Sequence, residues 1–160
     1  MRIVKNIFTK LHIFVLWAVL SAMLWMWIFT FVTDTTPDKK ITVYCHVPEV
    51  KSTELAVRLE ENIPDGLKMI KVHSFDYVMF DTSAITQGDV YIIPESEIEP
   101  FTEDLSGDGI KVYDYETKTG IASRYITYGE EDYYLFFGAN SVHMEDGKAL
   151  IIAEELLKLQ

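Results

Sequence analysis

Five side chains that follow predicted strands are the best candidates for ligand-binding chemistry in this chain of 160 residues: His46, Ser74, Glu95, Ser96 and Ser141. In open α/β sheets, ligands bind in the crevice beyond the carboxyl ends of the strands. An imidazole, a carboxylate and three hydroxyl groups could bind a small polar ligand there. Ser74 and Ser96 also begin predicted helices, whose first N–H groups could bind an anion. The alternative is that both serines only cap these helices, a role in which serine is a preferred residue.

A pair of histidines raises two further alternatives. His46 and His143 each follow a predicted strand, and adjacent strands would bring the two imidazoles together. Such a pair could bind a metal ion or act as an acid–base pair. The sequence has no third metal ligand at a recognisable spacing, so we expect neither of them.

Two other motifs fit a structural role better than a chemical one. The segment 104–109, DLSGDG, begins like a calcium-binding loop, but its twelfth position is Tyr115 rather than glutamate, so we interpret it as a surface turn. Cys45 ends a predicted buried strand, and no histidine shares a nucleophile motif with it. We expect a core residue there rather than a catalytic thiol. The sequence therefore predicts no metal, no cofactor and no enzyme activity.

Hydrophobic periodicity predicts the elements that position these residues. Runs of β-branched and apolar residues predict strands at 41–45, 67–72 and 89–93. A helix at 53–63 separates the first two strands, with Leu55, Ala56, Leu59 and Ile63 on its apolar face. A short helix from Ser74 separates the second and third strands, with an apolar face made of Tyr77, Phe80, Ala84 and Ile85. This alternation predicts a parallel sheet with right-handed crossovers.

The second half of the chain departs from this alternation. A short helix is expected from Ser96 to about Leu105, and the segments 110–115 and 121–128 predict an antiparallel hairpin. Residues 133–137 predict another buried strand, and a final helix follows Asp146-Gly147 with an inner face made of Ala149, Ile152, Ala153 and Leu156. The predicted fold class is α/β, a three-layer and mainly parallel sheet with an antiparallel hairpin, preceded by one transmembrane helix.

An uncharged run of residues, 13–32, predicts where the protein lies. The run is long enough to cross a hydrocarbon core of about 30 Å. Three basic residues and no acid precede it, and all 25 acidic residues follow it, so the positive-inside rule places the N-terminus in the cytoplasm. The predicted parts are a cytoplasmic N-terminus at 1–12, a signal anchor at 13–32, a tether at 33–39 and an extracellular domain at 40–160.

A cleaved signal peptide is the alternative to this anchor. Signal peptides have an apolar region of about 7–15 residues and a small-x-small cleavage site. The run at 13–32 is longer, contains three tryptophans and is followed by Thr33-Asp34-Thr35 rather than by such a site. We therefore expect a cell-membrane protein with a single, uncleaved span.

The charge of the exported part argues against two kinds of partner, nucleic acid and anionic lipid. It contains all 25 acidic residues and 11 of the 14 basic residues, a formal net charge of −14. This charge argues against a nucleic-acid partner and against docking on anionic lipid. The single cysteine excludes an intramolecular disulfide, which suits a bacterial cell surface and requires that the core alone stabilise the domain.

The order of these segments resembles one lobe of a known protein family. The segments KITVY at 40–44, IKV at 70–72 and GDVYIIPES at 88–96 resemble the first lobe of type 2 periplasmic-binding proteins, the extracellular solute-binding subunits of uptake transporters. YYLFFGANSVH at 133–143 resembles the strand that re-enters that lobe. The resemblance implies a solute-binding fold, with GDVYIIPES beside the ligand cleft.

The chain differs from that family in having room for one lobe only. A full binding protein closes two lobes over its ligand, whereas here a hairpin stands in place of the second lobe. We expect a membrane-anchored extracellular domain that binds a small solute or a partner protein without catalysis. The alternative is an accessory or structural subunit of a membrane complex, which docks a partner protein and has lost solute binding.

Overall fold

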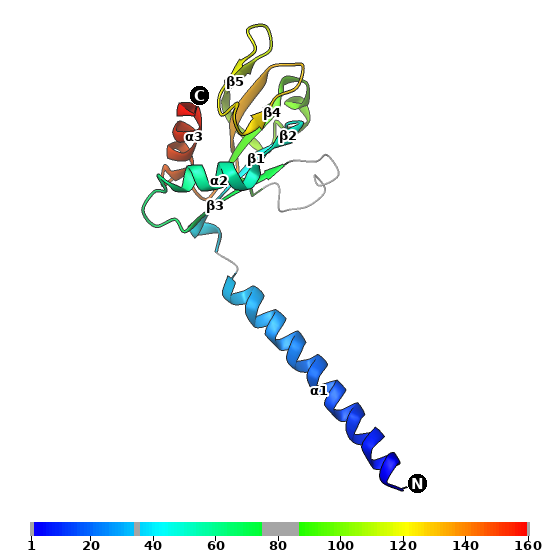
Figure 1. The fold of residues 1–160 in the computed structure, drawn as a ribbon. Helices are drawn as coiled ribbons and strands as arrows, with labels where there is room; N and C mark the ends of the chain where they lie inside the picture. The colour runs from blue at the N-terminus through cyan, green and yellow to red at the C-terminus, as the bar shows by residue number, and fades with distance from the viewer. Residues whose placement is uncertain (1, 34–35, 75–86, 160) are drawn as a thin grey trace. The chain divides into compact units, whose positions relative to one another are not determined.

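The computed structural model describes residues 2–33, 36–74 and 87–159, which belong to two separate units (Figure 1). The first unit contains the helix α1 (Arg2–Thr33). Its window His12–Phe29 has a mean hydropathy of 2.0, and none of that window is buried. Within the described residues, α1 is the one helix with the length and composition of a membrane span. The apolar N-terminal helix is thus confirmed, and it fits either an anchor or a signal sequence.

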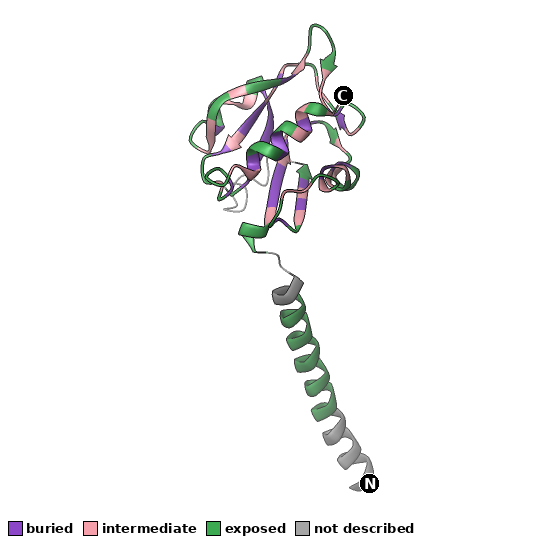
Figure 2. Ribbon diagram, turned by 90° about the vertical axis from the view of Figure 1, so that its left-hand side faces the viewer, coloured by how far each residue is buried: buried purple, intermediate pink, exposed green. Residues whose placement is uncertain are grey.

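The second unit is built on a six-stranded mixed sheet with the order β3-β1-β4-β8-β5-β6. Its strands are β1 (Lys40–Cys45), β3 (Met69–Ser74), β4 (Val90–Pro94), β5 (Leu105–Asp114), β6 (Thr119–Gly120) and β8 (Tyr133–Gly138). The pairs β1–β3 and β1–β4 are parallel, as predicted, whereas the pairs on β8 and β5 are antiparallel. Figure 2 shows buried residues along these strands, whereas residues 12–29 of α1 are exposed.

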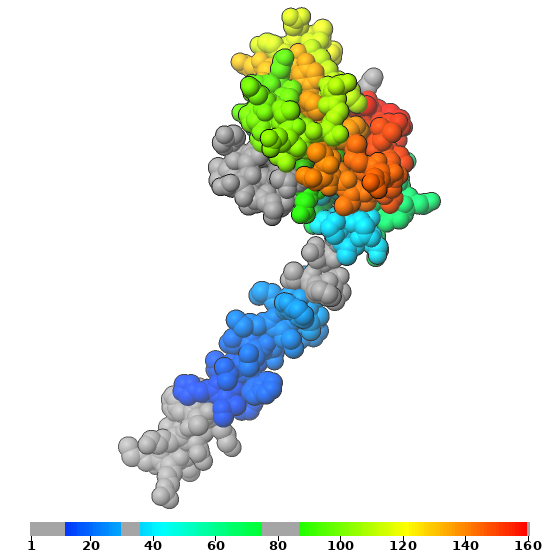
Figure 3. Space-filling model, turned by 180° about the vertical axis from the view of Figure 1, so that it is seen from behind, coloured from blue at the N-terminus to red at the C-terminus, as the bar shows by residue number. Residues whose placement is uncertain are grey.

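The first and last described segments of the domain lie side by side. A short 3-10 turn, η1 (Pro37–Lys39), leads into β1, and α3 (Lys148–Lys158) ends the fold. The His143 ring hydrogen-bonds to the backbone carbonyl groups of Pro37 and Lys40. Figure 3 shows the corresponding surface, with the C-terminal residues in orange beside the first residues of the domain in cyan.

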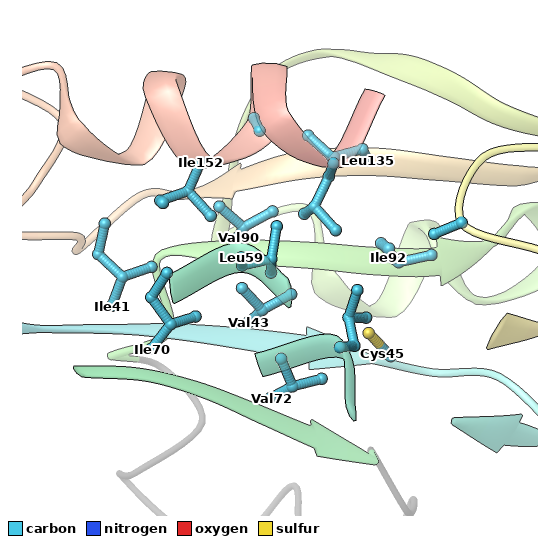
Figure 4. Packing of buried hydrophobic residues seen from close by; sticks show 14 of the residues in the cluster. Ile41, Val43, Cys45, Leu59, Ile70, Val72, Val90, Ile92, Leu135 and Ile152 are labelled. Carbon is cyan, nitrogen blue, oxygen red and sulfur yellow. The ribbon is translucent and has the colours of Figure 1, made fainter. Parts of the chain in front are cut away.

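The main core lies between one face of the sheet and two helices, α2 (Ser52–Glu60) and α3 (Figure 4). Alternate residues of β1 point to this face, namely Ile41, Val43 and Cys45, because successive side chains of a strand point to opposite faces. The helix α3 buries the four residues that its periodicity predicted: Ala149, Ile152, Ala153 and Leu156. Both described helices of more than one turn in this unit therefore pack on the same face.

Aromatic residues form the opposite face of the sheet. Tyr91, Ile93 and Phe136 pack there against Phe101, and Tyr44 stacks on Tyr91 with ring centroids 5.7 Å apart. The predicted helix from Ser74, with Tyr77, Phe80, Ala84 and Ile85, falls on residues 75–86, which lie outside the described residues. The α/β class is therefore confirmed, and the described part of the chain shows helices on one face of the sheet.

Other predicted elements differ from the structure in extent. The helix expected from Ser96 to Leu105 consists of two 3-10 turns, η3 (Glu95–Glu97) and η4 (Glu99–Phe101). Pro100 removes a backbone donor, and a proline in a helix interior breaks its hydrogen bonding. The N-cap position of η3 is Pro94, so Ser96 does not cap this turn. Ser52 is likewise the first residue of α2 rather than its cap.

The predicted hairpin is present but shorter than expected. The strands β5 and β6 pair only at Tyr113–Gly120 and Asp114–Thr119. Part of the segment 121–128 instead forms β7 (Ile126–Thr127), which pairs with β2 (Glu49–Val50) in a separate two-stranded sheet. The segment 104–109 mostly belongs to the start of β5, where the pairing with β8 is irregular, rather than to a simple surface turn.

Candidate functional site

A cavity of about 440 Å³ lies at the carboxyl ends of the three parallel strands. Cys45 pairs with Ser74 on one side and with Ile92 on the other, so β1, β3 and β4 end at the same edge of the sheet. The residues that line the cavity lie at or directly after these strand ends, or at the start of β8 and in the turn before it: His46, Val47, Pro48, Ser74, Pro94, Ser96, Glu97, Glu131 and Tyr133. This is the position in which α/β sheets bind ligands.

The structure brings three of the five predicted site residues together. His46, Ser74 and Ser96 all line the cavity. Glu95 lies next to Ser96 but is not among the lining residues, and its backbone N–H donates to the carbonyl of Asp132. Ser141 lies at the opposite end of the sheet, because β8 runs antiparallel to β4.

Three lining residues that sequence reasoning missed are Glu97 at the end of η3, Glu131 in the turn before β8, and Tyr133 at the start of β8. In the antiparallel register Pro94 pairs with Tyr133, so the start of β8 lies at the end of β4. The carboxylate of Glu131 accepts a 3.0 Å hydrogen bond from the backbone N–H of Ser96, which joins the two walls of the cavity. The acidic run EED at 130–132 is visible in the sequence and could have suggested a binding segment. Only the direction of β8 in the sheet shows that this run lies at the cavity.

Tyr133 contributes a phenol to the same cavity. Its hydroxyl oxygen accepts a 3.1 Å hydrogen bond from the backbone N–H of Gly129. Burial raises the pKa of this phenol above its ordinary value. The neutral phenol keeps its proton, so it can donate a hydrogen bond to a ligand while it accepts one from Gly129.

A buried polar network occupies the other end of the sheet. Asp89 is 3% exposed, and its carboxylate accepts a 2.8 Å hydrogen bond from the backbone N–H of Thr42. The Ser141 hydroxyl donates to the same carboxylate at 2.5 Å and accepts the backbone N–H of His143 at 3.1 Å. Burial raises the pKa of Asp89, against the lowering effect of these two hydrogen bonds. The network thus ties β4 to β1 and to the segment after β8.

His143 belongs to this end of the domain and not to the cavity. The ring is 1% exposed, and its Nε2 donates to the carbonyl oxygens of Pro37 and Lys40, each at 3.0 Å. Its Nδ1 lies 3.2 Å from a carboxylate oxygen of Asp146. A hydrogen bond from Lys148 at 2.7 Å is the largest cause that lowers the pKa of Asp146 to about 2.

His46 and His143 are too far apart in the fold to form the metal site or the acid–base pair that the sequence raised as alternatives. The two histidines lie at opposite ends of the strands, and the ring of His143 is directed at backbone carbonyls. The Ser141 hydroxyl contacts a carboxylate rather than an imidazole, so the arrangement is not that of a serine nucleophile with its base. Within the described residues, no group of three or more His, Cys, Asp or Glu side chains is placed to hold a metal ion.

No protein-family model, curated protein or solved structure matches this chain. The cavity geometry is therefore the main guide to function. It combines an imidazole, two carboxylates and three hydroxyl groups, and the described residues of its lining include no lysine and no arginine. Such a surface favours a ligand that carries positive charge and hydrogen-bond donors.

Cys45 should be chemically inert in the folded protein. The side chain is fully buried, and burial raises the pKa of the thiol to about 12. Only the thiolate is nucleophilic, so we expect no reaction with an aromatic disulfide reagent at pH 8 until the domain is unfolded in urea. The released thiolate chromophore measures the reaction, and the unfolded chain should release one equivalent because Cys45 is its single cysteine. Rapid release from the folded protein would contradict this placement.

Proposed function

We propose that this chain is a single-pass protein of a bacterial cell membrane, whose extracellular domain binds a small amine-bearing solute without catalysis. The observation that carries the proposal is the cavity at the ends of β1, β3 and β4, in which the predicted residues His46, Ser74 and Ser96 meet. A convergence of polar groups at the strand ends is the usual position of a ligand in an α/β sheet. The cavity volume of about 440 Å³ is within the range of small-molecule sites.

Charge asymmetry supports the proposed topology. Arg2, Lys5 and Lys10 precede the apolar part of α1, and the whole excess of acid follows it. Basic residues next to a span are retained in the cytoplasm, so residues 34–160 would be exported. The tryptophans of α1, which are numerous near its outer end, suit an uncleaved anchor better than a signal peptide.

The resemblance to a periplasmic-binding-protein lobe supports solute binding as the kind of function. The parallel strands β1, β3 and β4 occur in the order that the resemblance requires, and GDVYIIPES borders the cavity through Pro94 and Ser96. A three-layer arrangement, with helices on both faces of the sheet, is part of this proposal. The domain would bind its solute with one lobe, without closure by a second lobe of the same chain.

The charge of the cavity supports an amine as the recognised group. Glu97 and Glu131 supply two carboxylates, and the domain as a whole is strongly acidic, which would raise the local concentration of a cationic solute. Glu131 is already held in place by the backbone N–H of Ser96. A one-lobed site buries less of its ligand than a closed cleft, so we expect dissociation constants on the order of micromolar or weaker.

A series of four-carbon solutes tests this proposal on the full chain in lipid nanodiscs. Putrescine, 1,4-butanediol and succinate have similar lengths but carry positive, zero and negative charge. Putrescine should raise the free energy of unfolding, by about 2.7 kcal/mol when its concentration is about 100 times its dissociation constant. The other two solutes should leave it unchanged. Unfolding is followed by near-ultraviolet circular dichroism of the tyrosines, all nine of which follow residue 43.

Matched variants connect the effect to the cavity. Replacement of both Glu97 and Glu131 with glutamine should weaken putrescine binding by about tenfold or more, the equivalent of 1.4 kcal/mol. Glu116→Gln, in the exposed turn between β5 and β6, should leave binding unchanged. Equal stabilisation of all variants, or no stabilisation by putrescine at any concentration, would contradict the proposal. A domain that binds none of these solutes but co-purifies with a membrane protein would instead be an accessory docking subunit.

A further inference from the structure

The edge at which the chain enters the domain carries an unusual share of its exposed apolar side chains. We call this surface the entry edge, and it consists of residues 36–40, 65–68 and 142–151. Seven large hydrophobic side chains are exposed in the described part of the domain, and four of them lie at 142–151: Val142, Met144, Leu150 and Ile151. Val142, Met144 and Leu150 are 58%, 41% and 51% exposed. More than half of the exposed large hydrophobic side chains of the described domain thus fall within ten positions of the chain.

The entry edge is held together by contacts between its three segments. The buried ring of His143, between exposed Val142 and Met144, donates hydrogen bonds to the carbonyls of Pro37 and Lys40. The backbone N–H of Lys68 donates to the carbonyl of Lys39 at 2.8 Å. Figure 3 shows the orange C-terminal residues directly beside the cyan residues of this edge. Val142 and Met144, the two neighbours of His143, are therefore held close to Pro37 and Lys40 by these bonds.

The stretch of chain between α1 and the entry edge is short. Thr33 is the last residue of that helix, and Pro37 follows it by four positions. Four residues reach at most about 14 Å when fully extended. The headgroup layer on each side of a bilayer is about 5–8 Å thick, the difference between the whole bilayer and its hydrocarbon core divided over two sides. If α1 spans a membrane, the entry edge is within reach of its headgroups.

The entry edge also differs from the rest of the domain in charge. It contains four basic residues, Lys39, Lys40, Lys68 and Lys148, and four acidic residues, Asp38, Asp65, Glu145 and Asp146. Its formal net charge is therefore zero. The remaining part of 34–160 has seven basic and 21 acidic residues, which gives it the whole net charge of −14. An anionic bilayer would repel that remaining part and would not repel the entry edge.

We propose that the entry edge lies on the surface of the membrane that holds α1, with Val142, Met144 and Leu150 in the headgroup region. Apolar side chains gain free energy in the interface in proportion to the area that they bury. The tether makes this contact intramolecular, which raises the effective concentration of the membrane at this surface. The opposite edge, with the solute cavity, would then face away from the bilayer.

Lipid quenching of a site-specific fluorophore tests this placement in the full chain. Val142→Cys and Glu116→Cys are each labelled with a nitrobenzoxadiazole probe, and native Cys45 does not compete because it is fully buried. The proteins are reconstituted in vesicles of phosphatidylcholine and phosphatidylglycerol, with or without doxyl-labelled lipid. The probe at position 142 should lose about half of its fluorescence or more, as expected for a group in the interface. The probe at position 116, at the cavity end of the sheet, should lose little.

Two internal controls complete the experiment. All three tryptophans, Trp17, Trp25 and Trp27, lie in α1, so their quenching in the same vesicles reports that the helix is inserted. With a probe at Leu150→Cys, the double change Val142→Glu and Met144→Glu should reduce the quenching by about half, since a charge in the interface opposes burial. Equal quenching at positions 142 and 116 with inserted tryptophans would overturn the proposal. If the tryptophans are not quenched, α1 is not inserted, and the proposal fails. If the probe at position 142 is covered by another protein and is not quenched by the lipid, the proposal is also refuted.

Discussion

Replacement of Asp89 with alanine is expected to lower the free energy of unfolding of the domain by about 3 kcal/mol, because two hydrogen-bond donors lose their buried acceptor. The buried backbone N–H of Thr42 and the half-buried hydroxyl of Ser141 both donate to this carboxylate. Loss of the carboxylate also removes the side-chain link between Thr42 in β1 and Ser141 after β8. Urea unfolding followed by tyrosine circular dichroism measures the change.

Asp89→Asn is the matched control, because it keeps the shape and an acceptor oxygen. The amide oxygen can accept the N–H of Thr42, and the amide nitrogen can donate to the Ser141 oxygen, so the loss at neutral pH should be below about 1 kcal/mol. An asparagine variant as unstable as the alanine variant would show that the negative charge itself stabilises the fold. That result would contradict the assignment of Asp89 as a hydrogen-bond acceptor whose ionisation is opposed by burial.

The same pair of proteins makes a pH prediction with a definite sign. Burial raises the pKa of Asp89 above the value near 3.9 that an unfolded chain shows. Between these two values the folded state binds more protons than the unfolded state, so this group makes the domain less stable as pH rises. Asp89→Asn cannot titrate. The unfolding free energy of the native protein minus that of Asp89→Asn should therefore fall as the pH is raised from 4 toward neutrality. A rise of this value with pH would contradict the prediction.

Gly138→Ala should destabilise the domain by about 3 kcal/mol or more, because the added methyl group collides with backbone atoms. A Cβ at position 138 would lie 2.0 Å from the carbonyl oxygen of Gly88 and 3.1 Å from the Tyr91 ring. Neither strand can move aside freely, since the backbone N–H of Gly138 donates to the Asp89 carbonyl at 3.0 Å. The change would open the β4–β8 pairing that also positions the Asp89 network. Urea unfolding provides the measurement.

Gly107→Ala separates this collision from the general cost of replacing a glycine. Gly107 has a φ of +89°, and a Cβ there would meet nothing within 4 Å. Its replacement should cost only the conformational strain of a side chain at positive φ, about 1–2 kcal/mol. A Gly138→Ala protein no less stable than Gly107→Ala would show that the two strands are further apart than the structure places them.

Local sequence patterns predicted those parts of the fold in which the buried residues can be recognised within a single helix or strand. The inner face of α3 follows from helical periodicity, and the fully buried β4 follows from its continuous apolar run. The parallel pairing of β1, β3 and β4 follows from the alternation of strands with longer connections. Three cavity residues, His46, Ser74 and Ser96, could be predicted because they directly follow these strands.

The remaining site residues depend on the direction of β8, which its own sequence does not encode. YYLFF reads equally well as a parallel or an antiparallel strand, since both would be buried on two faces. The parallel alternative would have placed Ser141 and His143 at the cavity. The antiparallel register instead brings Glu131 and Tyr133 there and moves Ser141 to Asp89 at the other end. Asp89 was not a candidate because a carboxylate at the start of a strand is usually solvated, and only tertiary contacts bury it.

The contact between His143 and Lys40 sets the order of events when the chain is made. These residues are 103 positions apart, yet one hydrogen bond joins them at the start of the first strand. At about 5–20 residues per second, a ribosome needs about 5–20 s to advance from one to the other. During that time β1 lacks both β8 and the covering helix α3. The domain therefore cannot complete its fold until α3 has been synthesised.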